Sequence, residues 1–255
     1  MDEHFRDAAP AANAPLLLAL AELWNTHFLD TESLAVLPYA SALAKLPDYL
    51  QQLEMESNGK GVRSDGHPVD HPTAPVLWGN VGTTGQHAYH QLLHQGTRAF
   101  SAEFVLPLVP AHDLPDHHRW LLAHCLGQAE AFARGRTEEE VRQTLVEEGM
   151  DAAAAAAAAP HRVLPGDHPS TLVLLDDLSP ESLGALLALH EHKVFAHGMI
   201  WGINAFDQWG VEFGKVLGDR IHGALTAGDA DREEALEALG DATTRTLVRI
   251  LRNEQ

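Results

Sequence analysis

The sequence is poor in cysteine and in basic residues, and each shortage excludes a class of protein. Its 255 residues include one cysteine, Cys125, so no disulfide framework can form within the chain. A single buried, reduced thiol is typical of a cytosolic protein. The 17 lysines and arginines are outnumbered by 36 aspartates and glutamates, and the formal net charge is -19. An acidic surface of this kind argues against partners such as nucleic acid or an anionic membrane.

Long apolar runs and the common nucleotide-binding motifs are also missing. No apolar run approaches the ~20 residues that a membrane-spanning helix needs, and no basic, apolar signal segment opens the chain. We therefore expect a cytoplasmic protein. The sequence has no Gly-x-Gly-x-x-Gly, no Walker loop and no Gly-x-Ser-x-Gly, so neither nucleotide binding nor serine hydrolase chemistry is indicated.

Short apolar segments alternate with longer segments of helical periodicity along most of the chain. This alternation is typical of an α/β fold, a three-layer αβα sandwich whose mostly parallel sheet has helices on both faces. Thr137 and Glu140 form a capping-box pattern at the start of one helix, and the alanine run 152–159 is expected to be helical without carrying chemistry. The expected strands are 34–38, 75–79, 103–109 and 170–175, and the expected helices are 14–28, 40–55, 87–96, 117–134, 137–148, 180–200 and 209–221.

The length allows one large domain or two small ones. We expect a larger domain over residues 1–225 and a C-terminal helical arm over residues 226–255, where an acidic stretch precedes an amphipathic one. Ligands of parallel sheets usually bind outside the carboxyl ends of the strands. The glycine-containing turns that follow strands, at 79–85 and near Asn58-Gly59, are therefore the expected positions of a site.

Glu56 and His87 are two candidate catalytic residues. Glu56 lies in Met55–Lys60, just before a turn, where a carboxylate held by its neighbours could act as a general base. A capping or solvated glutamate is the simpler interpretation, and the local sequence alone favours it. His87 follows the polar segment 83–86 at an expected helix start. It could donate a proton at neutral pH or could only begin the helix, and the sequence does not separate these.

Three histidines, His87, His90 and His94, share one face of the same expected helix. Metal ligands normally converge from more than one element and have a supporting shell of hydrogen bonds. No cysteine or paired carboxylate accompanies these histidines, so a metal site is the less favoured hypothesis and we expect none.

Gln208 and Lys215 are the remaining candidate residues. They are seven residues apart in the segment Phe206–Val216, and two turns of helix would place them on nearly the same side. An amide and an ammonium group beside Trp209 suit a polar substrate that carries several hydroxyls.

Taken together, these segments closely resemble the glucose-6-phosphate isomerase (phosphoglucose isomerase) family. Their order and spacing agree with the family from about residue 1 to about residue 218, and the string from Phe206 to Lys215 is close to diagnostic. The segments that carry the resemblance are Leu37–Tyr39, Tyr49–Gln52, Met55–Lys60, Trp78–Gly79, Gly82–Thr83, Gly85–Ala88, His94–Thr97, His192–Lys193 and Phe206–Glu212 with Lys215.

The resemblance implies a sugar-isomerase (SIS) fold and an aldose–ketose isomerase of glycolysis and gluconeogenesis that uses no cofactor. Members interconvert glucose 6-phosphate and fructose 6-phosphate by opening the ring and moving a proton between C2 and C1 through a cis-enediol. By motif, Glu56 resembles the base that shuttles this proton, and His87 the residue that assists ring opening. Lys215 resembles the helper at the ring oxygen or the nearby hydroxyls, and Gln208 a substrate hydrogen-bond donor.

Family members are homodimers with active sites at the interface, so the resemblance implies that His87 serves the neighbouring subunit's substrate. Members are about twice as long and have two SIS domains, of which the first carries the phosphate-gripping loop and a Gly-Gly-Arg stretch. Neither is found here, so we interpret the chain as the C-terminal half and expect negligible isomerase activity from it alone. The alternatives are a non-catalytic phosphosugar-binding or dimerisation module, and one half of a split isomerase.

Overall fold

The computed structural model describes residues 1–228, 236 and 239–253. The chain forms two compact units, Met1–Phe206 and Asp207–Gln255, which are described separately below. The domain division expected from the sequence, with a boundary near residue 225, stays a prediction. Among the described residues, no helix combines the length and the apolar character that crossing a membrane requires.

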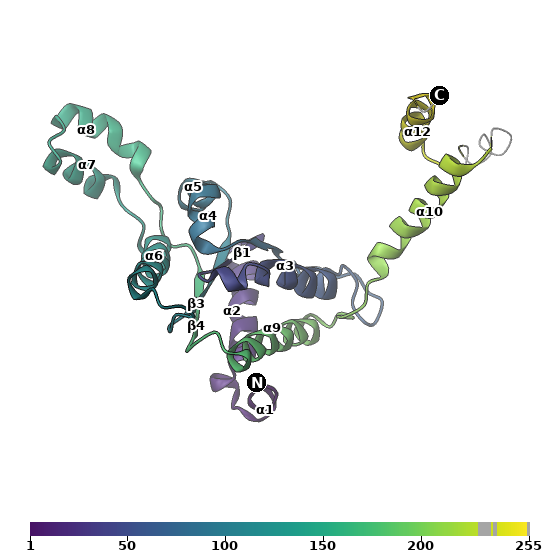
Figure 1. Ribbon diagram of the computed structural model, residues 1–255, viewed down its shortest axis with the longest axis horizontal. Helices are drawn as coiled ribbons and strands as arrows, with labels where there is room; N and C mark the ends of the chain where they lie inside the picture. The colour runs from purple at the N-terminus through teal and green to yellow at the C-terminus, as the bar shows by residue number, and fades with distance from the viewer. Residues whose placement is uncertain (229–235, 237–238, 254–255) are drawn as a thin grey trace. The chain divides into compact units, whose positions relative to one another are not determined.

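A parallel four-stranded sheet forms the centre of the first unit, as the alternating sequence pattern predicts (Figure 1). The spatial order of the strands is β2-β1-β3-β4, and all three neighbouring pairs are parallel. β1 and β3 are central and buried on both faces, which explains their nearly continuous apolar sequences. The strands are β1 (Ser33–Pro38), β2 (Val76–Gly79), β3 (Ser101–Pro107) and β4 (Ser170–Leu175).

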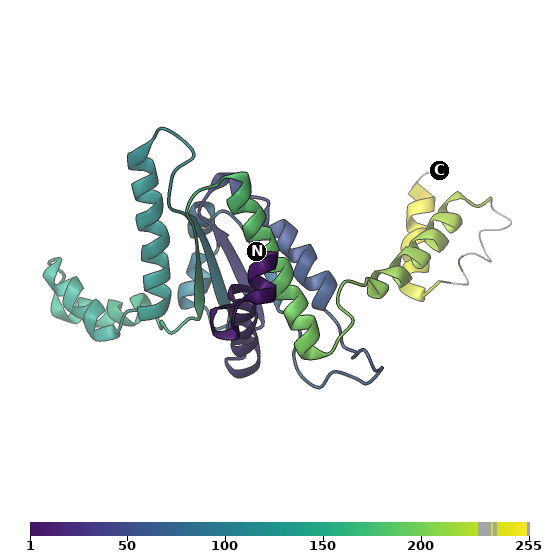
Figure 2. The ribbon, with the colours of Figure 1, turned by 90° about the horizontal axis from the view of Figure 1, so that it is seen from below.

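Helices cover both faces of this sheet (Figure 2), so the predicted αβα layering is confirmed. The α-helices of the first unit are α1 (Asp2–Asp7), α2 (Ala14–Phe28), α3 (Leu46–Gln51), α4 (Gly82–Ala88), α5 (His90–Gln95), α6 (Pro115–Arg134), α7 (Glu138–Glu147), α8 (Ala152–Ala158) and α9 (Pro180–Trp201). Short 3-10 turns are η1 (Pro10–Ala12), η2 (Ser41–Leu43) and η4 (Ala159–Arg162), and η3 (Gln52–Glu56) is a π-helix.

Successive residues of β1 supply the two halves of the core, because side chains alternate across a strand. Leu34 and Val36 face a cluster that includes residues of α3 and α9, such as Leu50 and Leu186. Ala35 and Leu37 face the opposite cluster, to which α5 contributes Leu93 and α6 contributes Cys125 and Phe132.

The strand order determines which face each connection covers. The step from β1 to β2 crosses the sheet in one direction, and the step from β2 to β3 crosses it in the other. Because crossovers between parallel strands are right-handed, α3 lies on one face while α4 and α5 lie on the other. The connections that leave the carboxyl ends of β1 and β3 therefore diverge to opposite faces, so a topological switch point lies between these two strands.

The α7–α8 hairpin matches its sequence pattern closely. The backbone N–H of Thr137 donates to Glu140 Oε2 at 2.8 Å, and the N–H of Glu140 donates to Thr137 Oγ1 at 3.3 Å, so the predicted capping box is present. The alanine run forms α8 and packs on α7 through a small apolar cluster that includes Val141, Leu145 and Ala155.

Two expected helices are broken. The segment 40–55 divides into η2, α3 and η3. Pro47 lies in the first turn of α3, where a new helix begins, and the last turn, which contains the buried Glu54, is a π-helix. The segment 82–85, expected as a turn, is the first turn of α4, and Tyr89 separates that helix from α5. A Cβ at Gly82 would lie 2.1 Å from a ring carbon of Tyr39, so only glycine allows this close packing.

The second unit contains η5 (Trp209–Val211), α10 (Glu212–Thr226) and α12 (Asp241–Asn253). Of the expected C-terminal helical arm, residues 229–235, 237–238 and 254–255 lie outside the described residues.

Candidate active site

Glu56 is the last residue of the π-helix η3 and is partly buried. The turn that follows is tightly held: Ser57 and Asn58 are buried, and Lys60 Nζ donates to the carbonyl oxygens of Glu56 and Ser57 at 2.6 and 2.9 Å. π-helical turns are rare and occur frequently at functional sites. The carboxylate of Glu56 is thus carried by a backbone whose position is fixed on both sides.

A buried charge network lies beneath this turn. Lys193 of α9, 1 % exposed, places its Nζ 2.6 Å from Glu22 Oε2 of α2 and 3.1 Å from Glu54 Oε2. Asn58 Nδ2 donates to Glu54 Oε1 at 3.1 Å and to the carbonyl of Val194 at 3.0 Å. Glu54 faces inward and Glu56 lies two residues further on, so the network ties the backbone of the candidate base to two helices.

Glu54 and Lys193 each stabilise the charged form of the other. Burial opposes ionisation of Glu54, but Lys193 and His197 outweigh it, and the pKa of Glu54 lies below its usual value. Burial likewise disfavours the ammonium of Lys193, yet Glu22, Glu54 and Glu103 together raise its pKa. Glu54 and Lys193 therefore keep their charges in the core because groups of opposite charge lie beside them.

A second buried pair lies in the same core. His190 Nε2 is 2.8 Å from Glu103 Oε1, and both side chains are almost fully buried. Burial opposes charge on both groups, but their mutual attraction lowers the pKa of Glu103 and raises that of His190. This pair explains why a carboxylate is tolerated in the middle of the central strand β3.

Glu22, Glu54 and His197 form the one group of three convergent potential metal ligands that the described part of the chain contains. His197 Nε2 contacts the carbonyl of Ala19 at 2.8 Å, and its Nδ1 lies 3.5 Å from Glu54 Oε1. Lys193 already places a cation between the two carboxylates. The donor set is therefore charge-compensated by the protein, and a divalent ion would have to displace or repel this ammonium.

The network lies at the amino edge of the sheet. Glu22 shares a cavity of about 10 Å³ with residues near the starts of three strands, among them Leu34, Ser101 and Thr171. The prediction that the Asn58-Gly59 turn follows a strand was therefore wrong, because it follows a helix that has already run back from the carboxyl edge. The other expected segment, 79–85, does lie at the carboxyl edge: residues 80–81 follow β2, and residues 82–85 form the first turn of α4.

His87 lies near the end of α4, and its side chain is exposed. Its neighbour Gln86 donates from Nε2 to the hydroxyl of Tyr39 at 2.9 Å, which fixes this helix against the end of β1. Glu56 ends the helical connection on one face of the sheet, and His87 lies in the helical connection on the other face. The structure therefore does not bring the two side chains together within the unit.

The three histidines expected on one helical face are divided by the break at Tyr89. His90 Nδ1 and His94 Nε2 both contact Gln128 Oε1, at 2.9 and 2.8 Å, whereas His87 belongs to the preceding helix. One amide oxygen of α6 thus contacts both rings and links α5 to α6, while the Nε2 atom of His90 is buried without a hydrogen-bond partner.

Gln208 and Lys215 belong to the second unit, and both side chains are exposed. Gln208 has non-helical backbone angles (φ -135°, ψ 28°) and precedes η5, while Lys215 is in the first turn of α10. The expectation that both residues lie on one side of a continuous helix was therefore wrong, because a 3-10 turn intervenes.

The sequence reasoning missed Glu22 and Asn58 as members of a buried network, and it gave Lys193 no role. One signal was available: Glu22 is a lone acid within the apolar run of α2, and Lys193 lies in the mostly apolar helix α9. Two isolated opposite charges on apolar helices are expected to pair when the helices pack.

Comparison with known proteins matches residues 1–247 to the family described as phosphoglucose isomerase. The chain belongs to this family. It is 48 % identical over 252 residues to the glucose-6-phosphate isomerase of Pseudomonas fluorescens, covering 99 % of the chain and 44 % of that relative. It is 47 % identical over 254 residues to that of Ectopseudomonas mendocina, covering 100 % of the chain and 45 % of the relative.

Among solved structures, the glucose-6-phosphate isomerase of Chlamydia trachomatis superimposes with a TM-score of 0.75 at 33 % sequence identity. The superposition covers 92 % of this chain and 43 % of that one. The chain therefore spans less than half the length of the relatives it matches, and the predicted family and fold are confirmed over that part.

Proposed function

We propose that this chain supplies part of the site of a glucose-6-phosphate isomerase, with Glu56 as the base that moves a proton between C2 and C1. The observation that carries this role is the anchored turn, in which Lys193, Glu54 and Asn58 hold the backbone on either side of Glu56. Isomerisation needs one carboxylate near two adjacent carbons, and small displacements of a base are costly to the rate.

The remaining candidate residues receive complementary roles. By their resemblance to the family motif, we assign Lys215 and Gln208 to the ring oxygen and hydroxyls of the sugar, and His87 to ring opening in the site of a second copy. During the reaction Glu56 takes the C2 proton, and the released electron pair forms the C1=C2 bond while O1 gains a proton, which gives the cis-enediol. The proton held by Glu56 then returns at C1 while O2 loses its proton, which gives the ketose. The cycle is redox-neutral and uses no cofactor.

The assignment of His87 to a second copy is supported by topology. Its helix lies on the opposite face of the sheet from α3, which carries the chain to Glu56. A homodimer would allow both groups to reach one sugar without rearranging the sheet.

Activity of the chain alone is expected to be negligible, because a family phosphate loop and enediolate-stabilising arginine are found nowhere in it. A coupled assay of fructose 6-phosphate conversion tests this expectation directly, and robust turnover by the purified chain would contradict it. The part of the P. fluorescens relative that this chain does not match, fused ahead of Met1, is expected to restore activity.

The fusion also tests the individual roles. Glu56→Gln is expected to lower kcat by about 10²–10⁴-fold, as loss of a general base does, whereas Glu138→Gln on the exposed face of α7 leaves it unchanged.

Inactive Glu56→Gln and His87→Gln fusions, unfolded together and refolded as a mixture, are expected to regain about a quarter of the activity, because half the dimers are mixed and carry one intact site. Absence of any regain would refute the shared site.

A non-catalytic binding module or one half of a split enzyme would give different results. A module would leave the fusion inactive, and a split enzyme would regain activity when the two parts are mixed without being fused.

A further inference from the structure

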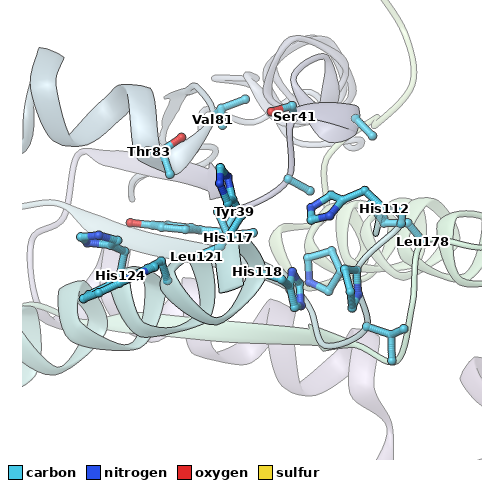
Figure 3. Close-up of a pocket in the computed structure, with 17 residues that line it drawn as sticks. Tyr39, Ser41, Val81, Thr83, His112, His117, His118, Leu121, His124 and Leu178 are labelled. Atoms are coloured by element: carbon cyan, nitrogen blue, oxygen red, sulfur yellow. The ribbon is translucent and has the colours of Figure 1, made fainter. Parts of the chain in front are cut away.

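A pocket of about 410 Å³ opens at the carboxyl edge of the sheet, away from the Glu56 turn. Tyr39, just after β1, lines it (Figure 3), as does Pro107 at the end of β3. It therefore lies at the topological switch point, where the connections from two adjacent parallel strands leave toward opposite faces. This is the position at which open α/β sheets bind ligands.

The lining of this pocket contrasts with the rest of the chain. Although the sequence contains 36 acidic residues, no aspartate or glutamate is among the described residues that line it. Four histidines do line it, and Figure 3 shows them arranged around the opening together with three hydroxyl side chains. The histidines are His112, His117, His118 and His124, and the hydroxyls belong to Tyr39, Ser41 and Thr83.

Hydrogen bonds to the backbone orient the rings of His112 and His118. His112 Nδ1 accepts from the backbone N–H of Leu114 at 3.2 Å, so its proton is on Nε2 and can be donated elsewhere. His118 Nε2 lies 2.9 Å from the carbonyl of Leu108 and donates to it, so only a protonated ring could donate through Nδ1. Within the described chain no hydrogen bond engages the rings of His117 and His124.

The N-terminus of α6 adds to this arrangement. The helix is 20 residues long and begins at Pro115, and no side chain caps its first turn, in which His117 lies. The nearby Asp116 is exposed and pairs with Arg119. Unsatisfied N–H groups and the helix dipole favour an anion beside the histidines.

We propose that this pocket binds the phosphate group of a small phosphate monoester. A phosphate presents three strong acceptor oxygens and up to two negative charges, which suit several imidazole and hydroxyl donors without a neighbouring carboxylate. The volume is that of a site for a molecule of hexose-phosphate size. Among the described residues, only Glu22, Glu54 and His197 bring three potential metal ligands together, so the four histidines do not form a metal site of three converging ligands.

Isothermal titration calorimetry on the full 255-residue chain tests the proposal with inorganic phosphate, sulfate, glucose 6-phosphate and glucose. The first three are expected to bind and glucose is not. His117→Gln combined with His124→Gln is expected to weaken phosphate binding at least about tenfold, because two charge-assisted donors are lost. Both side chains are exposed, so this variant is expected to fold, and retained circular dichroism verifies it.

His161→Gln is the matched control, since it removes an exposed histidine outside the pocket. It is expected to leave phosphate binding unchanged. Glu56→Gln is also expected to leave phosphate binding unchanged, and this result would distinguish the pocket from the proposed isomerase site. Four results would each overturn the proposal. They are unchanged phosphate affinity in the His117/His124 double variant, binding of glucose as tight as that of glucose 6-phosphate, a loss of phosphate affinity in Glu56→Gln equal to that in the double variant, and failure of every anion to bind. Tighter binding of glucose 6-phosphate than of phosphate would identify a sugar phosphate, and equal binding would identify free phosphate as the ligand.

Discussion

Replacing Lys193 by methionine tests whether the buried network holds the first unit together. The substitution keeps much of the side-chain volume but leaves Glu22 and Glu54 buried without their ammonium partner. Removing one partner of a buried ion pair costs about 3–5 kcal/mol, which is comparable to the whole stability of many domains. We expect the free energy of unfolding, measured with urea near neutral pH, to fall by about that amount.

The pH dependence gives a sharper signature than the size of the loss. In the wild type, the lowered pKa of Glu54 contributes stability that is present above its unfolded pKa and is lost as the pH falls through the folded value. The raised pKa of Lys193 contributes stability below its unfolded pKa that is lost only as the pH rises through the folded value. Acidification from pH 8 to pH 5 should therefore change this contribution little in the wild type.

In Lys193→Met the direction of the pKa shift of Glu54 on folding is expected to reverse. Burial is then no longer outweighed by the ammonium, so its folded pKa is expected to rise above the unfolded one, and the protein gains stability as the pH falls toward 5. Adding Glu22→Gln and Glu54→Gln should recover much of the loss at neutral pH. Lys45→Met is the control, because Lys45 pairs with Asp48 on the surface and should have little effect. A Lys193→Met chain as stable as the wild type, or one that loses stability on acidification, would refute the reasoning.

Three further predictions concern packing, capping and the thiol. Gly82→Ala should destabilise the chain by about 1–3 kcal/mol in urea, because the new methyl group would meet the ring of Tyr39, while Gly184→Ala, which meets nothing within 4 Å, should not. Thr137→Ala should cost about 1 kcal/mol by removing the capping box, and Thr137→Ser should restore most of it in the same denaturation assay. Burial raises the pKa of Cys125 to about 12, so a thiol reagent such as Ellman's reagent at pH 8 should label it in urea but not in the native chain; rapid native labelling would show that the core of α6 opens.

Local pattern was sufficient for much of the fold. The strand expected at 170–175 is β4 to the residue, and α9 extends one residue beyond its expected end. These segments combine strong periodicity with clear boundary residues, such as Ser179 and Pro180 at the start of α9 and Gly202 at its end. Where local and tertiary preferences agree, the sequence alone predicts the element.

The broken helices show where local pattern was insufficient. Residues 40–55 have helical periodicity, but the π-helical turn before Glu56 accompanies the inward position of Glu54, whose partner Lys193 lies about 140 residues further along the chain. Similarly, the start of α4 depends on contact between Gly82 and Tyr39 from another element. Neither interaction can be recognised from neighbours in the sequence.

The candidate site was predicted as a set of residues but not as an arrangement. Motif resemblance selected Glu56 and His87, yet it contained no information on strand order, and strand order decides which residues can meet. Because β2 and β3 lie on opposite sides of β1, the connection leading to Glu56 and the one that carries His87 cover opposite faces of one sheet. This separation is consistent with the proposal that the two groups reach one sugar from two copies of the chain. The same divergence opens the crevice between β1 and β3, so the strand order that separates the two proposed catalytic residues also creates the histidine-lined pocket.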